Sequence, residues 1–391
     1  MKRRTFLGCG ASLSLVGAGA LAANGQSQRR LLVLLLRGGM DGLSAIPPLG
    51  DPELQGIRGG LVPPDALPGN SFFGVHPALP TFAGLMADRQ AVAIHAAGFG
   101  YRGRSHFEGQ DIMQSGLVKP FTSPSGWLGR ALQKANVGTG VAISIPMPLI
   151  LRGDPSAETE FPTWLEKPPQ AAYSAVREMW APDADLSLIG QRMAGGPAPS
   201  AASASPSAPS PMSAPESNQL MRSPKSLAHQ AGLRMARDDG PMVGLIDFVG
   251  FDTHASQGAT EGEHANRLKM VDEVLGTFRA TLGERWNETL VLTVTEFGRT
   301  AAQNGTTGTD HGWASCILAA GGLVKTAGIV ADWPGLAKAR LFEGRDLTAT
   351  VDANAVYAEA LTSVFGLTSA QIRDGVLGHA AAPLARNLFR T

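Results

Sequence analysis

Apolar residues along this chain collect into runs that are separated by glycine-rich or polar stretches. A run that is apolar at nearly every position is typical of a β-strand buried on both faces, as in a parallel sheet. The pattern predicts strands over residues 31–36, 91–96, 141–151, 242–249, 289–295 and 316–320. Pro146 and Pro148 would make the third an edge or irregular strand, because proline donates no ladder hydrogen bond.

Two segments between these runs have the three- and four-residue apolar spacing of amphipathic helices. The first covers residues 263–282, with an apolar stripe from Leu268 to Leu282, and the second covers residues 353–365. Strands that alternate with helices predict a layered α/β fold with a mostly parallel sheet.

Composition excludes several classes of protein. The 391 residues include 33 Lys plus Arg and 33 Asp plus Glu, so there is no basic excess of the kind that nucleic-acid binding needs. Hydrophobic residues make up 43% of the chain, which is too many for a disordered protein. Two cysteines are too few for a disulfide scaffold.

Residues 1–22 have the layout of an export signal: a basic start, an apolar Gly/Ala/Leu-rich run and the small-residue site Ala20-Leu21-Ala22. The run is too short and too interrupted for a stable membrane span. Arg3-Arg4 before Thr5-Phe6-Leu7 favours the twin-arginine route, which exports folded proteins. An ordinary signal with an incidental second arginine is the alternative. We therefore expect a periplasmic or secreted protein that uses the twin-arginine export machinery.

Removal of residues 1–22 would leave 30 basic against 33 acidic residues, a net charge of −3. It would also leave Cys316 as the last cysteine, so no intramolecular disulfide could form. Residues 194–217 are nearly all Ala, Ser, Pro and Gly, and we interpret them as a disordered surface insertion. We expect a single domain over residues 29–391 that contains this insertion; two domains joined by this segment as a linker are the alternative.

Asp41 is the first candidate functional residue. It follows the first strand in Arg37-Gly38-Gly39-Met40-Asp41-Gly42, and open α/β sheets bind ligands beyond the carboxyl ends of their strands. An acid at this place suits a metal or a substrate. The alternative is a turn residue that is held by local hydrogen bonds.

The segment 102–107, Arg-Gly-Arg-Ser-His-Phe, is dense in functional groups for a chain with 17% charged residues. Arginines such as Arg104 suit capture of phosphate or sulfate. Ser105 is a candidate nucleophile if a metal lowers its pKa. It is equally a candidate N-cap of a helix from His106, with Glu108 completing a capping box. The two interpretations are compatible, because a helix N-terminus favours an anion.

Three further motifs accompany the later strands. Asp252-Thr253-His254 follows the fourth strand, where alternation puts both side chains on one side, either as two metal ligands or as an acid that orients a surface histidine. Glu296 ends the fifth strand, where a carboxylate is costly unless it is paired, hydrogen-bonded or metal-bound. Asp310-His311 lies in a polar loop before the sixth strand.

Taken together, the motifs predict a cluster on the loops at one edge of one sheet. Carboxylates mixed with imidazoles suit Zn²⁺, Mn²⁺ or related divalent ions. The candidate ligands are Asp41, His106, Asp252, His254, Glu296, Asp310 and His311. By contrast, we expect His95, inside a strand, to be a core residue and His264, at a helix start, to be a surface residue.

The residues and the order of these motifs resemble those of a known family. The matching strings are Leu35-Leu36-Arg37-Gly38-Gly39-Met40-Asp41-Gly42-Leu43, Phe73-Gly74-Val75-His76-Pro77-Ala78-Leu79, Arg104-Ser105-His106-Phe107, Asp252-Thr253-His254, Thr295-Glu296-Phe297-Gly298-Arg299-Thr300 and Thr309-Asp310-His311-Gly312. The sequence resembles the exported bacterial family catalogued as domain of unknown function fifteen hundred and one, which is grouped with the alkaline-phosphatase/sulfatase superfamily. The resemblance covers nearly all of the chain after the export signal.

The resemblance implies a three-layer α/β/α sandwich, alkaline-phosphatase-like, with one or two divalent ions (Zn, Mn, Mg or Ca) at the strand ends. It implies Ser105 as the nucleophile, Asp252, His254 and His311 around one ion, and Asp41 and Glu296 as further metal-binding acids. Two departures weaken the ligand set: Asp-x-His replaces Asp-x-x-x-His, and Glu296-Phe297 replaces Asp-His. His106 or Asp310 would then substitute, or the second ion is absent.

The sequence thus predicts an exported metal-dependent hydrolase of phosphate or sulfate esters, with a small anionic ester or carbohydrate-linked substrate. Arg104 or Arg299 would hold the non-bridging oxygens. No Cys-x-Pro-x-Arg string is present, which excludes a formylglycine sulfatase. The alternative is a non-catalytic binding or assembly protein that retains the fold and a degenerate metal site.

Overall fold

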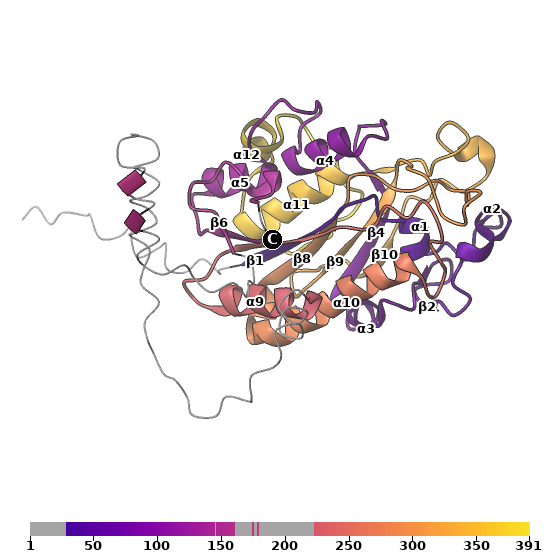
Figure 1. Ribbon diagram of the computed structural model, residues 1–391, viewed down its shortest axis with the longest axis horizontal. Helices are drawn as coiled ribbons and strands as arrows, with labels where there is room; N and C mark the ends of the chain where they lie inside the picture. The colour runs from indigo at the N-terminus through magenta and orange to yellow at the C-terminus, as the bar shows by residue number, and fades with distance from the viewer. Residues whose placement is uncertain (1–28, 145, 161–173, 176–177, 180–222) are drawn as a thin grey trace, which may run out of the picture.

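The computed structural model describes residues 29–144, 146–160, 174–175, 178–179 and 223–391 (Figure 1). The predicted export signal and the predicted insertion at residues 194–217 lie outside these residues. Within them, no helix is both long enough and apolar enough to cross a membrane.

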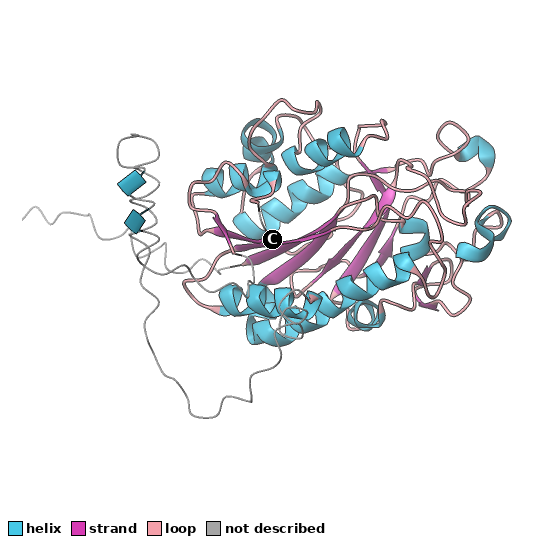
Figure 2. Ribbon diagram, in the orientation of Figure 1, coloured by secondary structure: helices cyan, strands magenta, loops and turns pink. Residues whose placement is uncertain are grey.

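A nine-stranded sheet runs through the molecule between helices (Figure 2). The strand order is β10-β4-β9-β8-β1-β7-β5-β6, and β11 also pairs with β4. Its strands are β1 (Arg30–Leu36), β4 (Ala91–Gly98), β5 (Gly140–Ile143), β6 (Glu158–Thr159), β7 (Val243–Phe248), β8 (Thr289–Val294), β9 (Ser315–Ala320), β10 (Gly328–Val330) and β11 (Val351–Asp352). A short antiparallel pair, β2 (Leu67–Pro68) and β3 (Gly74–Val75), stands apart from the sheet.

Helices cover both faces of the sheet (Figure 1). One layer contains α4 (His106–Ser115), α5 (Trp127–Ala135), α11 (Ala353–Phe365) and α12 (Ser369–Ile372), and the other contains α3 (Pro80–Ala87), α9 (Pro224–Ala236) and α10 (Glu263–Leu282). The short helices α1 (Gly42–Ala45) and α2 (Leu54–Arg58) lie near one end of the sheet.

The alternation of side chains along β1 divides the core in two. Leu31, Val33 and Leu35 pack with α4, α5, α11 and α12, whereas Leu32, Leu34 and Leu36 pack with α3, α9 and α10. All seven residues of β1 are buried, as a strand covered on both faces requires. The predicted three-layer α/β/α sandwich is confirmed.

The sheet is mostly parallel, with one reversed strand that matters for the site. β1 pairs in parallel with β7 and β8, but β9 is antiparallel to β4 and β8. The amino-terminal end of β9 therefore lies at the same edge as the carboxyl ends of β1, β4, β7 and β8. Loops from five strands meet at this edge.

One predicted strand is wrong in its extent. The apolar run 141–151 contains a strand only as far as Ile143, and a 3₁₀ turn covers Leu149–Leu151. Pro146 and Pro148 interrupt the run, because neither residue can donate a hydrogen bond to a neighbouring strand.

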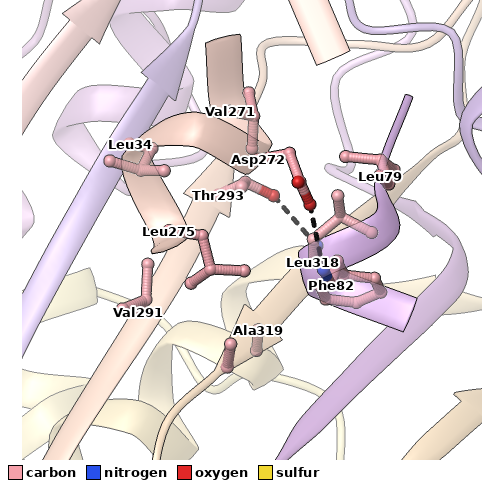
Figure 3. Close-up of a pocket in the computed structure, with 11 residues that line it drawn as sticks. Leu34, Leu79, Phe82, Val271, Asp272, Leu275, Val291, Thr293, Leu318 and Ala319 are labelled. Carbon is pink, nitrogen blue, oxygen red and sulfur yellow. Dashed lines mark hydrogen bonds between the residues drawn. The ribbon is translucent and has the colours of Figure 1, made fainter. Parts of the chain in front are cut away.

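The helical layer below the sheet contains a small apolar gap between α3, α10 and β8 (Figure 3). Its volume of about 10 Å³ is at the lower limit for one water molecule, so we regard it as a packing defect rather than a ligand site. Asp272 borders it and accepts hydrogen bonds from the Thr81 and Phe82 backbone N–H groups in the first turn of α3.

Candidate metal centre

Four loops bring the predicted residues together at the edge of the sheet where β1, β4, β7 and β8 end and β9 begins. His106 begins α4 after β4, Asp252 follows β7, and Glu296 follows β8. His311 precedes β9, and the reversed direction of that strand carries it to the same edge. A bridge between Arg299 and His311 joins two of these loops.

Glycine permits the close approach of the β1 loop to the β7 loop. Gly38 has φ of 117°, and a Cβ there would lie 2.4 Å from the Asp252 backbone nitrogen. Another residue at this position would push the two loops apart. Gly38 therefore fixes the distance between the end of β1 and the segment that carries Asp252.

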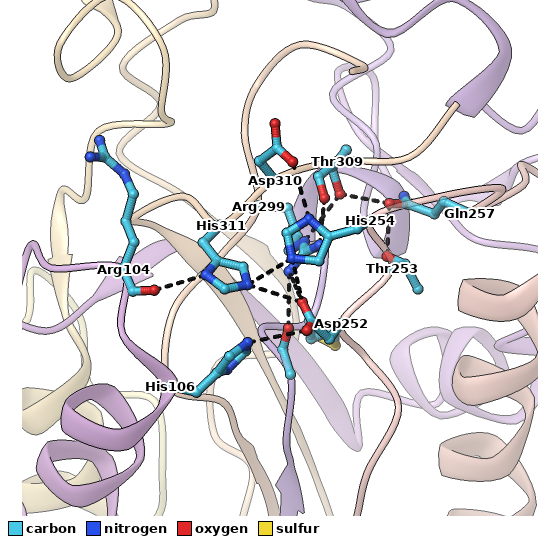
Figure 4. A network of polar contacts seen from close by, with 12 residues as sticks. Arg104, His106, Asp252, Thr253, His254, Gln257, Arg299, Thr309, Asp310 and His311 are labelled. Carbon is cyan, nitrogen blue, oxygen red and sulfur yellow. Dashed lines mark hydrogen bonds and ion pairs between the residues drawn. The ribbon is translucent and has the colours of Figure 1, made fainter. Parts of the chain in front are cut away.

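Three imidazoles converge on the Asp252 carboxylate (Figure 4). The Nε2 atoms of His254 and His311 each lie 3.0 Å from Asp252 Oδ1, and His106 Nε2 lies 3.3 Å from Asp252 Oδ2. His254 Nε2 and His311 Nε2 are 2.9 Å apart. Ligand atoms of His106, Asp252 and His311 all lie within 4.8 Å of one another.

The Nδ1 atom of each imidazole faces an oxygen outside this cluster. Nδ1 of His106 lies 2.9 Å from Glu296 Oε1, that of His254 lies 3.0 Å from Asp310 Oδ1, and that of His311 lies 2.8 Å from the Arg104 carbonyl oxygen. When Nδ1–H donates to each oxygen, Nε2 carries the free lone pair. All three lone pairs then point toward the same carboxylate.

Glu296 is a buried outer member of this arrangement. Its Oε1 also accepts hydrogen bonds from the Gly38 backbone N–H at 2.8 Å and from Gln110 Nε2 at 3.2 Å. Burial opposes ionisation, but the hydrogen bonds of His106, Gly38 and Gln110 help to lower the pKa of Glu296 below its usual value. The Glu296 hydrogen bond, which outweighs burial, raises the pKa of His106.

Arg299 holds Asp252 in place from the buried side. Its NH1 group donates to Asp252 Oδ1 at 2.7 Å and to the Gly38 carbonyl at 3.2 Å, and its other nitrogens donate to Thr309. Burial opposes ionisation of Asp252, but the hydrogen bond and charge of Arg299 lower its pKa. Because the Arg299 side chain is fully buried and engaged, the structure gives it a positioning role rather than free N–H groups for an ester.

The Arg104 guanidinium points away from the imidazoles, although its carbonyl faces His311 (Figure 4). It donates to Asp346 at 2.9 Å and to Glu343 at 2.6 Å. Ser105 occupies the N-cap position of α4 as predicted, but its side chain makes no capping hydrogen bond. The predicted capping box is not formed, since Glu108 accepts instead from the Tyr101 hydroxyl.

Asp41 belongs to a different, fully buried network. Its carboxylate pairs with Arg58 and accepts from Ser44 Oγ at 2.8 Å and from Gln257 Nε2 at 2.6 Å. Burial opposes ionisation, but Arg58 and its neighbours push the pKa of Asp41 well below its usual range. Asp41 also accepts a hydrogen bond from the Leu43 backbone N–H and so caps α1, as the interpretation as a turn residue expects. Its ion pair with the buried Arg58 guanidinium was not expected from the sequence.

The sequence also predicts the places of two histidines outside the cluster. His95 is buried in β4, as expected. His264 is 1% exposed, so the prediction of a surface residue is wrong. Its ring lies edge-on to the rings of Phe251 and His76, with centroids 6.2 Å away in each case.

Sequence reasoning missed the amides that organise the site. Gln110 lies one helical turn after His106, and this spacing on α4 was a usable signal for a shared partner. Gln257 accepts from Thr253 and Thr309 and donates to Asp41, which links the two polar networks. No local pattern indicates Gln257, because its partners come from distant loops.

The donor set fits a divalent ion of the zinc class. His106 Nε2 is buried, and its contact with Asp252 Oδ2 at 3.3 Å does not have the geometry of a hydrogen bond. Imidazole with carboxylate is a usual donor set for zinc. Metal-bound histidines also characteristically donate Nδ1–H to a carboxylate or backbone carbonyl, as all three do here. The Asp252 and His254 side chains are 41% and 45% exposed, so an ion between them would face solvent.

A sequence-family model described as "Protein of unknown function (DUF1501)" matches residues 106–376. The chain belongs to this family. The matched DUF1501 region includes all three clustered histidines, Asp252, Glu296, Arg299 and Asp310, whereas Asp41, Arg104 and Ser105 precede it. No curated protein matches the sequence.

Solved structures show likeness to this DUF1501 protein. The PsFucS1 sulfatase from Pseudoalteromonas sp. is 14% identical with a TM-score of 0.45, over 95% of this chain and 74% of that one. A protein in the alkaline phosphatase superfamily from Vibrio parahaemolyticus is 12% identical with a TM-score of 0.40, over 87% and 67%. The C-terminal periplasmic domain of EcEptC from Escherichia coli, in complex with Zn, is 9% identical with a TM-score of 0.39, over 75% and 73%.

Proposed function

We propose that this chain is an exported, metal-dependent hydrolase of phosphate or sulfate esters. The observation that carries the proposal is the set of three imidazoles whose Nδ1 atoms face outer oxygens while their Nε2 atoms converge on Asp252. Asp252, His106, His254 and His311 would hold one divalent ion of the zinc class. Glu296, Asp310 and the Arg104 carbonyl would orient the three rings from outside.

The exposure of the cluster favours catalysis over a purely structural role. Four protein ligands fill a structural zinc site, so a catalytic ion held by these four residues would have to accept the ester as a fifth ligand on its exposed side. Here Asp252 and His254 are partly exposed, and Arg299 secures Asp252 only from the buried side. A divalent ion bound there would supply Lewis-acid stabilisation of charge on the ester oxygens.

Ser105 is the proposed nucleophile. It precedes His106 at the N-terminus of the ten-residue helix α4, where backbone N–H groups and the helix dipole favour an anionic ester. Its hydroxyl is not used to cap the helix. The engagement of Arg104 and Arg299 elsewhere leaves the helix terminus and the ion as the proposed partners of the non-bridging oxygens.

A metal-loading and substrate panel tests this proposal. The mature chain would be loaded with Zn²⁺ or Mn²⁺ and assayed with p-nitrophenyl phosphate, bis-p-nitrophenyl phosphate and p-nitrophenyl sulfate. We expect hydrolysis of at least one ester that a chelator abolishes, and a fall of at least a hundredfold in kcat for Ser105→Ala and His311→Ala. The matched control is His229→Ala, an exposed histidine on α9, which should keep full activity.

Two results would contradict parts of this proposal. Metal binding without hydrolysis of any ester would favour the binding or assembly role that the sequence leaves open. Full activity in Ser105→Ala would instead assign the attack to water.

We also propose that the chain is exported by the twin-arginine route, on the basis of Arg3-Arg4 before the apolar run. Export after folding suits a protein that acquires its metal inside the cell. Replacing both arginines by lysine should stop export while leaving synthesis unchanged, as fractionation would show; continued export would indicate the ordinary route.

A further inference from the structure

We propose that a cavity beside the metal centre binds the alcohol half of the ester, and that this half is a hydroxyl-rich, sugar-like group with a second negative charge. The inference rests on the proposed function for its place in the reaction. The cavity has a volume of about 430 Å³ and is lined by Gly98–Arg102, Trp313, the segment around β11, and Asn354 in the first turn of α11. This volume is within the range of ordinary ligand pockets.

Two residues that line the cavity adjoin segments that carry residues of the metal centre. The Tyr101 hydroxyl accepts from the Ser105 backbone N–H at 3.2 Å and donates to Glu108 at 2.7 Å, so one wall contacts the start of α4. Trp313 follows His311 by two residues, and its Nε1–H donates to the Phe99 carbonyl at 2.8 Å. An ester that reacts at Ser105 would therefore have its alcohol half close to this cavity.

Arg102 gives the cavity a positive charge that stacking holds in place; the cavity wall also contains the Asp352 carboxylate, whose oxygens accept hydrogen bonds from the Asn354 and Ala382 backbone N–H groups instead. The guanidinium carbon of Arg102 lies 4.8 Å from the Trp313 ring centre and 5.2 Å from that of Phe342, so stacking restrains it. No carboxylate pairs with Arg102 in the part of the chain that the structure describes. Other arginines at this edge, such as Arg104, have acidic partners. A stacked arginine whose N–H groups have no hydrogen-bond partner among the described residues suits an anionic group on a ligand.

Asn354 adds one buried acceptor, Oδ1, that has no hydrogen-bond partner among the described residues. The residue is 5% exposed, its backbone N–H donates to Asp352 Oδ1 at 2.9 Å, and its Nδ2 lies 3.3 Å from His379 Nε2. The remaining side-chain atom, Oδ1, is buried and makes no hydrogen bond within the described residues. A ligand hydroxyl would satisfy it in either orientation of the amide, because a hydroxyl both donates and accepts.

The chemical class follows from these two residues together. A simple anion would satisfy Arg102 and leave Asn354 unpaired, while a neutral sugar would do the reverse. A polyhydroxylated group with a carboxylate, sulfate or phosphate would satisfy both. We therefore choose glucuronate as the probe, with glucose as the neutral partner and acetate as the anion without hydroxyls.

Calorimetric titration of the folded, metal-loaded mature protein tests the inference without any turnover. We expect glucuronate to bind at least tenfold more tightly than either glucose or acetate. Arg102→Ala should weaken glucuronate about tenfold and leave glucose unchanged, and Asn354→Leu should weaken both sugars. The matched control is Arg279→Ala, because Arg279 also stacks on a tryptophan, Trp286, but lies on α10 away from the cavity.

Glucuronate binding that survives Arg102→Ala, or no binding to the wild-type protein, would overturn the inference. This failure is separable from failure of the proposed function. A protein that hydrolyses esters but ignores glucuronate lacks the subsite alone, whereas one that binds glucuronate but neither metal nor ester retains the subsite and lacks the hydrolase.

Discussion

Two aspartates from neighbouring loops, Asp41 and Asp252, show how the same residue type takes opposite roles. Asp41 is fully buried and its carboxylate is satisfied by Arg58, Ser44 and Gln257. Asp252 is 41% exposed, has one guanidinium partner and faces three imidazoles. A guanidinium neutralises a buried carboxylate permanently, whereas imidazole lone pairs beside an exposed one create a donor set for a cation. The partners, rather than the acid, separate a structural site from a metal site.

The largest expected effect is on the unfolding free energy, through the buried Asp41. Arg58→Met leaves the Asp41 charge buried without compensation, and removal of one partner of such a pair costs about 3–5 kcal/mol of unfolding free energy. Urea unfolding of the metal-free protein measures it. The matched control Arg237→Met removes an exposed ion pair with Asp239 and should change stability too little to measure. Equal costs for the two variants would contradict the structural role of Asp41.

The next effect concerns the stabilisation by zinc, through the exposed Asp252 and its imidazole partners. His311→Ala and Asp252→Asn should remove the stabilisation that zinc gives the protein, which is about 2.7 kcal/mol when free zinc exceeds its Kd a hundredfold. Thermal unfolding with zinc and with chelator measures this difference. Asp41→Asn should retain the zinc-dependent shift, although its baseline stability falls. A shift lost in Asp41→Asn and kept in His311→Ala would reverse the two roles.

A smaller effect is expected from the outer partners of the imidazoles. Glu296→Gln should weaken zinc binding by about 10–100-fold, because the carboxylate orients His106 and raises its basicity. Competition with a fluorescent chelator measures the affinity. Asp272→Asn is the control, since Asp272 is a buried carboxylate that caps α3 instead. Unchanged affinity in Glu296→Gln would show that His106 does not bind the ion.

The last prediction tests the buried residues through pH, with an effect that is small near pH 6 and grows as the pH falls. Burial lowers the pKa of His264 from 6.5 to about 3, so the unfolded chain binds the proton more tightly than the folded one. Stability should therefore fall as pH drops below 6.5, by up to about 1.4 kcal/mol per pH unit from this group. His264→Leu should flatten the unfolding profile between pH 6.5 and pH 4, while His229→Leu should not. Parallel profiles for His264→Leu and the wild type would contradict this.

The layered fold was predictable because the buried strands are apolar at nearly every position, with few exceptions such as His95 in β4 and Asp247 in β7. The 31–36 run became β1 with only a one-residue difference at its start, since both faces of that strand are covered. Residues 141–151 were predicted as one edge or irregular strand because of Pro146 and Pro148, but the strand ends already at Ile143, ahead of both prolines. Strand direction left no trace in the sequence. In an all-parallel sheet His311, which precedes a strand, would lie at the opposite edge, and only the antiparallel β9 brings it to Asp252.

The residue types of the site were also predictable, but their partners were not. His106, Asp252, His254 and His311 were indicated by their places beside strand ends, and the structure gathers them. Arg58 was not, because its contact with Asp41 depends on how α2 packs beneath the edge. Arg104 and Arg299 were selected for charge alone, and long-range acids and carbonyls decide where their guanidinium groups point.

X-ray absorption at the zinc edge of the reconstituted mature protein tests the central claim most directly, because it reports the donors of the bound ion. The account predicts one ion per chain with three imidazole nitrogens at about 2.0–2.1 Å and one carboxylate oxygen, and loss of one imidazole in His311→Ala. A spectrum of oxygen donors without imidazole, or a protein that binds no zinc, would contradict it.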